Sequence, residues 1–239
     1  MLRSVCRALV RTGAHAPRMM STVGHADRIC GDSISGNRRR TEELSVAPDD
    51  VIRTYLHRSR DALIWKLDGL SEYDLRRPLT PTGTNLLGLI KHTASVTADY
   101  LGAVFGRPFE REMPWLGEDA EPNADLWVTA DESREEIVQL WHDAWTHADA
   151  TLDALPLDAT GEVPWWPSER NPVTLHQIAV HLIAELHRHA GHADIVREQI
   201  DGAAGMLPTA DNLPAVDAGW WPSYVERVES AARAAGALG

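Results

Sequence analysis

The sequence predicts an all-α protein, a four-helix bundle with long irregular loops and a short C-terminal helix. Apolar residues recur at spacings of three and four through four long segments, whereas strand-like alternation is weak everywhere. Clusters of proline and glycine separate these segments. Long amphipathic segments joined by irregular loops are typical of helical bundles.

The first two helices follow recognisable start signals. The first is expected from Pro48, with Asp49 in its first turn, and its apolar pattern continues to about Leu70. A turn rich in proline and glycine follows. Thr84 is the expected cap of the second helix, which should run over roughly residues 85–105.

The remaining helices are predicted in the same way. The third, over roughly residues 133–155, follows acidic residues and ends before Pro156. Thr174 opens the fourth long helix, because Gln177 stands three residues later at the spacing of a capping box. This helix should end near Asp201, directly before a glycine. A short final helix is expected over residues 223–235.

Charge divides the chain into two parts. Residues 1–40 contain eight Arg and two acidic residues, a charge of +6, whereas the remaining residues carry 15 basic and 33 acidic groups, or −18. We therefore expect a basic extension over residues 1–46 and a helical domain over residues 47–239. An Arg-rich, acid-poor extension is typical of a mitochondrial transit peptide. A disordered extension and a start codon assigned too early are the open alternatives.

Composition also excludes several classes of protein. The net charge of −12 argues against nucleic acid as a partner. No stretch approaches the 18 consecutive apolar residues of a membrane-spanning helix. The two cysteines, Cys6 and Cys30, are too few for a disulfide scaffold or a four-cysteine zinc module. Both lie in the basic extension, so any thiol chemistry in the helical domain must use the thiol of a cosubstrate.

The fourth long helix carries the strongest chemical signal. An arc of about 80°, at 100° per residue, holds four polar residues that can bind metal: His181, Glu185, His189 and His192. The same arc holds Ile178 and Val196, so this face is expected to be buried. Burying a carboxylate among imidazoles is costly unless the groups are paired or coordinated. Glu185 and His189, one turn apart, can reach one cation; a hydrogen-bonded face without metal is the alternative.

A third ligand should come from a neighbouring helix. His92 is the candidate, because it stands among apolar residues in the middle of the second helix. His142 and His147 on the third helix are competitors. Three protein ligands leave a coordination position open, as in catalytic zinc sites. A metal there would lower the pKa of a bound water or thiol and so generate a nucleophile.

These residues and several short motifs carry a resemblance to a known family. The motifs are Gly-Leu-Ile-Lys-His92, the histidine-rich run 181–194, Phe-Gly-Arg-Pro-Phe over 105–109, Val-Pro-Trp-Trp-Pro over 163–167 and Asp-Asn-Leu-Pro over 211–214. Together they resemble the DinB-like superfamily over residues 48–239. The resemblance is to its actinobacterial branch, which is related to mycothiol-dependent S-transferases and to mycothiol-dependent maleylpyruvate isomerase.

The resemblance implies a DinB-like bundle with one divalent metal held by His92, Glu185 and His189. The ion would most simply be zinc, and nickel, iron and manganese stay open because their ligand preferences overlap. A glutamate and a histidine on the last long helix are similar to the ligand pair of the isomerase. Thr97 departs from the pattern, because many relatives have an acidic residue after the first ligand.

The resemblance further implies an enzyme, a metal-dependent thiol S-transferase. Mycothiol or a similar thiol would bind the metal as thiolate and attack an electrophilic substrate. His181 and His192 would orient ligands or relay protons. Arg188 and Arg197 would hold the cosubstrate, with structural salt bridges as the alternative.

Two other functions stay open at this point. One is a hydrolase that uses a metal-bound water, and the other is a non-catalytic metal-binding stress protein. The expected partners are a small-molecule thiol and an electrophile, with no nucleic acid and no membrane. A homodimer is left open, and a cytoplasmic location is expected.

Overall fold

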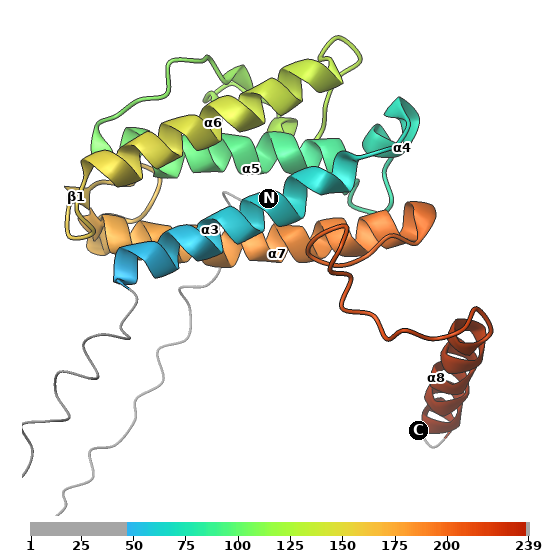
Figure 1. The fold of residues 1–239 in the computed structure, drawn as a ribbon. Helices are drawn as coiled ribbons and strands as arrows, with labels where there is room; N and C mark the ends of the chain where they lie inside the picture. The colour runs from blue at the N-terminus through green and yellow to red at the C-terminus, as the bar shows by residue number, and fades with distance from the viewer. Residues whose placement is uncertain (1–46, 238–239) are drawn as a thin grey trace, which may run out of the picture.

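A computed structural model of the chain describes residues 47–237. The basic extension expected over residues 1–46, with both cysteines, lies outside the described residues. Element labels follow Figure 1 and therefore begin at α3.

Four long helices form the body of the protein (Figure 1). They are α3 (Pro48–Ile64), α5 (Leu86–Tyr100), α6 (Arg134–Ala154) and α7 (Leu175–Asp201). Helix α3 packs on α7, and α5 packs on both α6 and α7. This arrangement confirms the predicted all-α four-helix bundle. Helix α5 is the most buried of the four, because it is covered on two sides.

The helix starts follow from capping chemistry. Helix α6 begins after Ser133, which forms a complete capping box with Glu136. Helix α5 begins after Asn85, whose side chain accepts a hydrogen bond from the Gly88 N–H at 2.8 Å. The prediction that Thr84 caps this helix was wrong by one residue. The N–H of Thr84 bonds to the Thr80 hydroxyl, so Thr84 belongs to the preceding turn.

Helix α7 has the predicted boundaries. Thr174 accepts a hydrogen bond from the Gln177 N–H at its start. Gly202 ends the helix in the left-handed region, with φ of 79°, where a residue without Cβ is favoured.

Other boundaries differ from the predictions. The first helix ends at Ile64 and gives way to a 3₁₀ turn, η1 (Trp65–Leu67), and a short helix, α4 (Glu72–Arg76). The second ends at Tyr100, and residues 103–105 form a separate 3₁₀ turn, η2 (Ala103–Phe105). The final helix, α8 (Trp220–Gly236), begins three residues early. Short elements such as α4 escape detection because five residues show too little of a period.

The long loops contain the remaining short elements. Between α5 and α6 lie η3 (Pro114–Leu116) and η4 (Ala124–Leu126). Between α6 and α7, strand β1 (Thr160–Gly161) pairs antiparallel with β2 (Val173–Thr174), and η5 (Ser168–Arg170) lies between them. Thr160 faces Thr174 and Gly161 faces Val173. This pairing fixes the chain at the start of α7.

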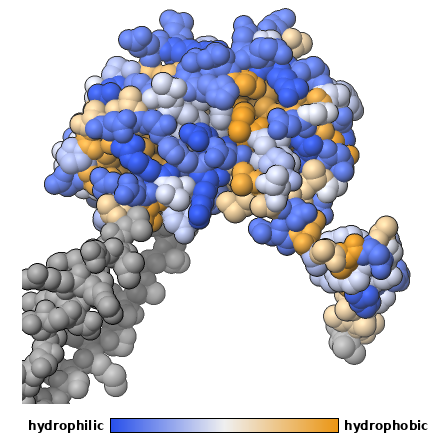
Figure 2. Space-filling view, in the orientation of Figure 1, coloured by the Kyte–Doolittle hydropathy of each residue, from blue (hydrophilic) through white to orange (hydrophobic). Residues whose placement is uncertain are grey.

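The core lies between the four long helices. It consists mainly of aliphatic side chains, with Trp141 and Trp145 contributed by α6. On the face seen in Figure 2, hydrophilic residues predominate and the hydrophobic ones form separate groups. Helix α8 stands apart from the bundle in Figure 1, and none of its residues is buried. No helix within residues 47–237 is long and apolar enough to cross a membrane.

Candidate metal centre

The packing of α5 against α7 brings His92, Glu185 and His189 together. One potential ligand atom from each lies within 4.8 Å of the other two. The His92 and His189 rings are 4.8 Å apart between centroids. Glu185 and His189 are one helical turn apart, and Glu185 Oε1 is 3.1 Å from His189 Nε2. The three ligands expected from the resemblance therefore form one cluster.

The cluster contains buried polar atoms that lack partners. His92 and His189 are only 3% and 2% exposed. Within residues 47–237, neither Nε2 of His92 nor Nδ1 of His189 has a hydrogen-bond partner. Leaving such an atom unpaired costs about 1–3 kcal/mol, and coordination of a cation would remove that cost. Two imidazoles and one carboxylate are a donor set that suits zinc and similar divalent ions. The residues present thus fit a metal.

The protonation states also suit metal binding. Burial lowers the pKa of His189, so its imidazole is neutral near pH 7. The hydrogen bond from His189 lowers the pKa of Glu185, which keeps this carboxylate ionised. Metal ligands must be deprotonated, so neither residue requires a further change of charge.

Asp125, which sequence reasoning missed, supports His92 from the outside. Its Oδ2 lies 2.6 Å from His92 Nδ1. Burial acts to raise the pKa of Asp125, but the hydrogen bond with His92, together with weaker interactions, outweighs this effect, and the pKa lies below its usual value. An ionised carboxylate can only accept, so Nδ1 of His92 donates to it. Among the described residues, Nε2 is the ring nitrogen without a partner. Carboxylates orient metal-binding histidines in this way.

No sequence signal pointed to Asp125, because it comes from η4 in the long loop after α5. The resemblance led us to expect an acidic residue at position 97, where this chain has Thr97. Thr97 is instead buried, and its hydroxyl donates to the carbonyl of Thr93 at 2.7 Å. A residue distant in sequence therefore supplies the carboxylate that the helix itself lacks.

The two histidines expected to assist catalysis, His181 and His192, have different neighbours. His192 lies beside His189, with ring centroids 5.3 Å apart. His181 packs between Tyr100 and Trp166, at 5.1 and 5.2 Å between centroids. Both are partly buried, and burial lowers the pKa of each.

The two arginines expected to hold the cosubstrate, Arg188 and Arg197, differ in both exposure and partners. Arg188 is exposed, and its charge helps to lower the pKa of Glu185. Arg197 is buried; it pairs with Asp201 and donates to the carbonyls of Lys66 and Asp68, both at 2.9 Å. These bonds tie α7 to η1. The structure thus gives Arg197 the salt bridge that was the alternative to cosubstrate binding.

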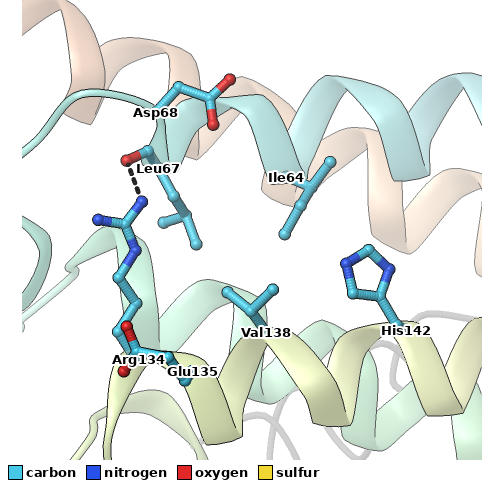
Figure 3. Close-up of a pocket in the computed structure, with 7 residues that line it drawn as sticks. All are labelled: Ile64, Leu67, Asp68, Arg134, Glu135, Val138 and His142. Carbon is cyan, nitrogen blue, oxygen red and sulfur yellow. Dashed lines mark hydrogen bonds between the residues drawn. The ribbon is translucent and has the colours of Figure 1, made fainter.

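The competitors of His92 lie elsewhere. His147 Nε2 contacts the Arg107 carbonyl at 2.8 Å. His142 lines a cavity of about 320 Å³ between α3 and α6, together with Ile64, Leu67, Asp68, Arg134, Glu135 and Val138 (Figure 3). Arg134 crosses one end of this cavity and donates to the Leu67 carbonyl at 2.9 Å. The cavity shares no residue with the metal cluster.

Comparison with known families identifies the chain. A family model described as MST, mycothiol-S-transferase, matches residues 51–202. This range runs from the first turn of α3 to the end of α7 and contains all three clustered ligands. The chain belongs to the mycothiol-S-transferase family. No curated protein matches it. Membership confirms the resemblance to the mycothiol-related branch of the DinB-like proteins.

Proposed function

We propose that the protein is a divalent-metal-dependent thiol S-transferase that uses mycothiol or a similar low-molecular-weight thiol. The observation that carries the proposal is the buried cluster of His92, Glu185 and His189 in a member of the mycothiol-S-transferase family. Zinc is the favoured ion on donor chemistry, with nickel, iron and manganese as alternatives.

The reactive sulfur belongs to the cosubstrate, because residues 47–239 contain no cysteine. A bound divalent cation would lower the pKa of a coordinated thiol and so favour the nucleophilic thiolate. The sulfur forms a bond to the electrophilic atom of the substrate as the bond from that atom to its leaving group breaks, and the leaving group departs with the electron pair. The thiol proton passes to a nearby base or to water. The electrophile is a small molecule.

Other residues around the cluster support this reaction. His192 stands beside His189 and is neutral near pH 7, so it can accept the thiol proton. His181 is held by its aromatic neighbours and would position the substrate or relay a proton. Arg188 presents an exposed cation on the same helix, which suits a polar thiol cosubstrate.

Location and assembly are part of the proposal. A low-molecular-weight thiol is kept reduced inside cells, which favours a cytoplasmic site of action. A homodimer is compatible with the bundle.

Metal content is the first test. The purified chain should contain about one divalent ion, and His92→Ala and Glu185→Ala should lose it, because each leaves only two ligands. His176→Ala is the matched control, since His176 is exposed on the same helix and should leave the metal in place. Full occupancy in both ligand variants would contradict the assignment.

Thiol binding is the second test. In a cobalt-substituted sample, mycothiol should change the visible spectrum through a new sulfur ligand. Turnover of an electrophile without added thiol would favour a hydrolase instead. Failure of every thiol to alter the spectrum would favour a non-catalytic binding protein.

A further inference from the structure

The loop segment of residues 124–132 is fastened along one side of α5. At the cap of α5, Asn85 Nδ2 donates to the Leu126 carbonyl at 3.1 Å. Asn85 lies about one turn before Gly88 and two turns before His92. Two turns further along the same side of α5, His92 Nδ1 lies 2.6 Å from Asp125 Oδ2. The segment therefore meets the same side of the helix that presents a metal ligand.

Gly88 allows this close approach. A Cβ built at position 88 would overlap the carbonyl oxygen of Leu126. The loop backbone thus lies directly against the helix, and only a residue without a side chain leaves room for it. By contrast, a Cβ at Gly191 of α7 would meet no atom within 4 Å.

Lys91 fastens the other end of the segment. Its side chain is 3% exposed and pairs with Glu132 at 2.7 Å. It also donates to the Trp127 carbonyl at 3.2 Å and lies over the Trp115 ring. Lys91, Asn85 and His92 together hold the segment in one position against α5, beside the metal cluster.

We propose that the segment 124–132 is a clamp that couples the order of the loop between α5 and α6 to metal binding, with Asp125 as the positioning residue that aims His92 Nε2 at the cation. The inference rests on the metal site proposed above. The carboxylate of Asp125 fixes the tautomer and rotation of the His92 ring. Gly88 lets the backbone of the segment lie directly against α5. Metal bound to His92 stabilises the docked segment in return, because the coupling is reciprocal.

Competition with a chelator for Zn²⁺ tests whether Asp125 positions His92 for metal binding. Asp125→Ala should weaken zinc affinity about 10- to 100-fold, as outer carboxylates of metal-binding histidines do, and Asp125→Asn should weaken it less. Asp119→Ala, at an exposed carboxylate of the same loop, should match the wild type. If Asp125→Ala binds zinc as tightly as the wild type, the inference is overturned.

Gly88→Ala tests whether the position of the segment is coupled to metal binding, and it changes no polar group. It should displace the segment, weaken zinc affinity and speed proteolytic cleavage of the loop between α5 and α6. Gly191→Ala is the control, and it should change neither quantity. Zinc should slow cleavage of the wild-type loop but not that of Asp125→Ala; equal protection of both would overturn the coupling.

The outcomes distinguish this inference from the proposed function. If the wild type binds no divalent ion, both are wrong. If the wild type binds zinc through His92 and Glu185 but Asp125→Ala is indistinguishable from it, only the clamp is wrong. Should Gly88→Ala fail to fold, the Asp125 series still decides the question.

Discussion

At the scale of single residues, Tyr100 links the loop after β1 to the helix that carries His92. Its hydroxyl oxygen accepts hydrogen bonds from the indole N–H groups of Trp165 and Trp166, at 3.2 and 3.1 Å. Its ring also packs against His181. One hydroxyl thus holds two tryptophans over a residue that we assign to the site.

Replacing Tyr100 with phenylalanine should destabilise the protein by about 1–3 kcal/mol, because two indole N–H groups lose their acceptor and Trp166 is buried. Urea unfolding followed by tryptophan fluorescence measures the change. Zinc content should stay the same, because Tyr100 is not a ligand. A lower zinc content in a folded Tyr100→Phe variant would show that the tryptophan contacts also shape the cluster.

At the scale of elements, the end of α7 is joined to η1 by Arg197. The guanidinium donates to the carbonyls of Lys66, within η1, and Asp68, directly after it. Asp201, one turn further along α7, accepts a hydrogen bond from the same guanidinium at 2.6 Å. The hydrogen bond from Arg197 holds the pKa of Asp201 below its usual value. The ionised carboxylate therefore stabilises the folded state.

This linkage predicts a pH dependence. Because the folded-state pKa is lowered, the contribution of Asp201 is fully present above the unfolded pKa of about 3.9 and is lost as the pH falls through the folded value. Asp201→Asn should cost about 1 kcal/mol or less at pH 7, since the side chain is 36% exposed and water screens the pair.

Urea titrations between pH 7 and 3 measure this effect. The difference between wild type and Asp201→Asn should shrink as the solution becomes more acidic. Asp158→Asn, at an exposed carboxylate, is the control and should show no such trend. A difference that stays constant down to pH 3 would contradict the assignment of the stability to the Arg197 pair.

At the scale of the whole molecule, the bundle and α8 are separate units in their packing. Helix α8 exposes Trp221, Tyr224, Val225 and Val228. The Trp220 ring stacks on Tyr224, and Trp221 meets Tyr224 edge-on. The family match ends at residue 202, before the connection to α8. The metal cluster is complete without this helix.

A chain that ends at residue 217 should therefore fold as the full chain does. We expect the same urea midpoint and the same zinc content, because no residue of α8 is buried. Both quantities can be measured on the two proteins side by side. A lower midpoint for the shortened chain would mean that α8 stabilises the bundle.

The sequence by itself determined the four long helices and the ligand pair on the last of them. Helix α7 was predicted to within a residue, because Thr174 and Gly202 act through local backbone geometry. The pairing of Glu185 and His189 also followed from the sequence, since a spacing of four places both on one face of a helix. Short elements such as α4 were missed, because five residues define no period.

Only the tertiary structure decided what lies across from that face. Asp125 reaches His92 through a loop path that no period or spacing describes, and Gly88 matters because the Leu126 carbonyl lies against it. Arg197 likewise could not be assigned until its carbonyl partners were known. Local spacing fixes neighbours on one helix, whereas contacts between helices and loops depend on how the whole chain packs.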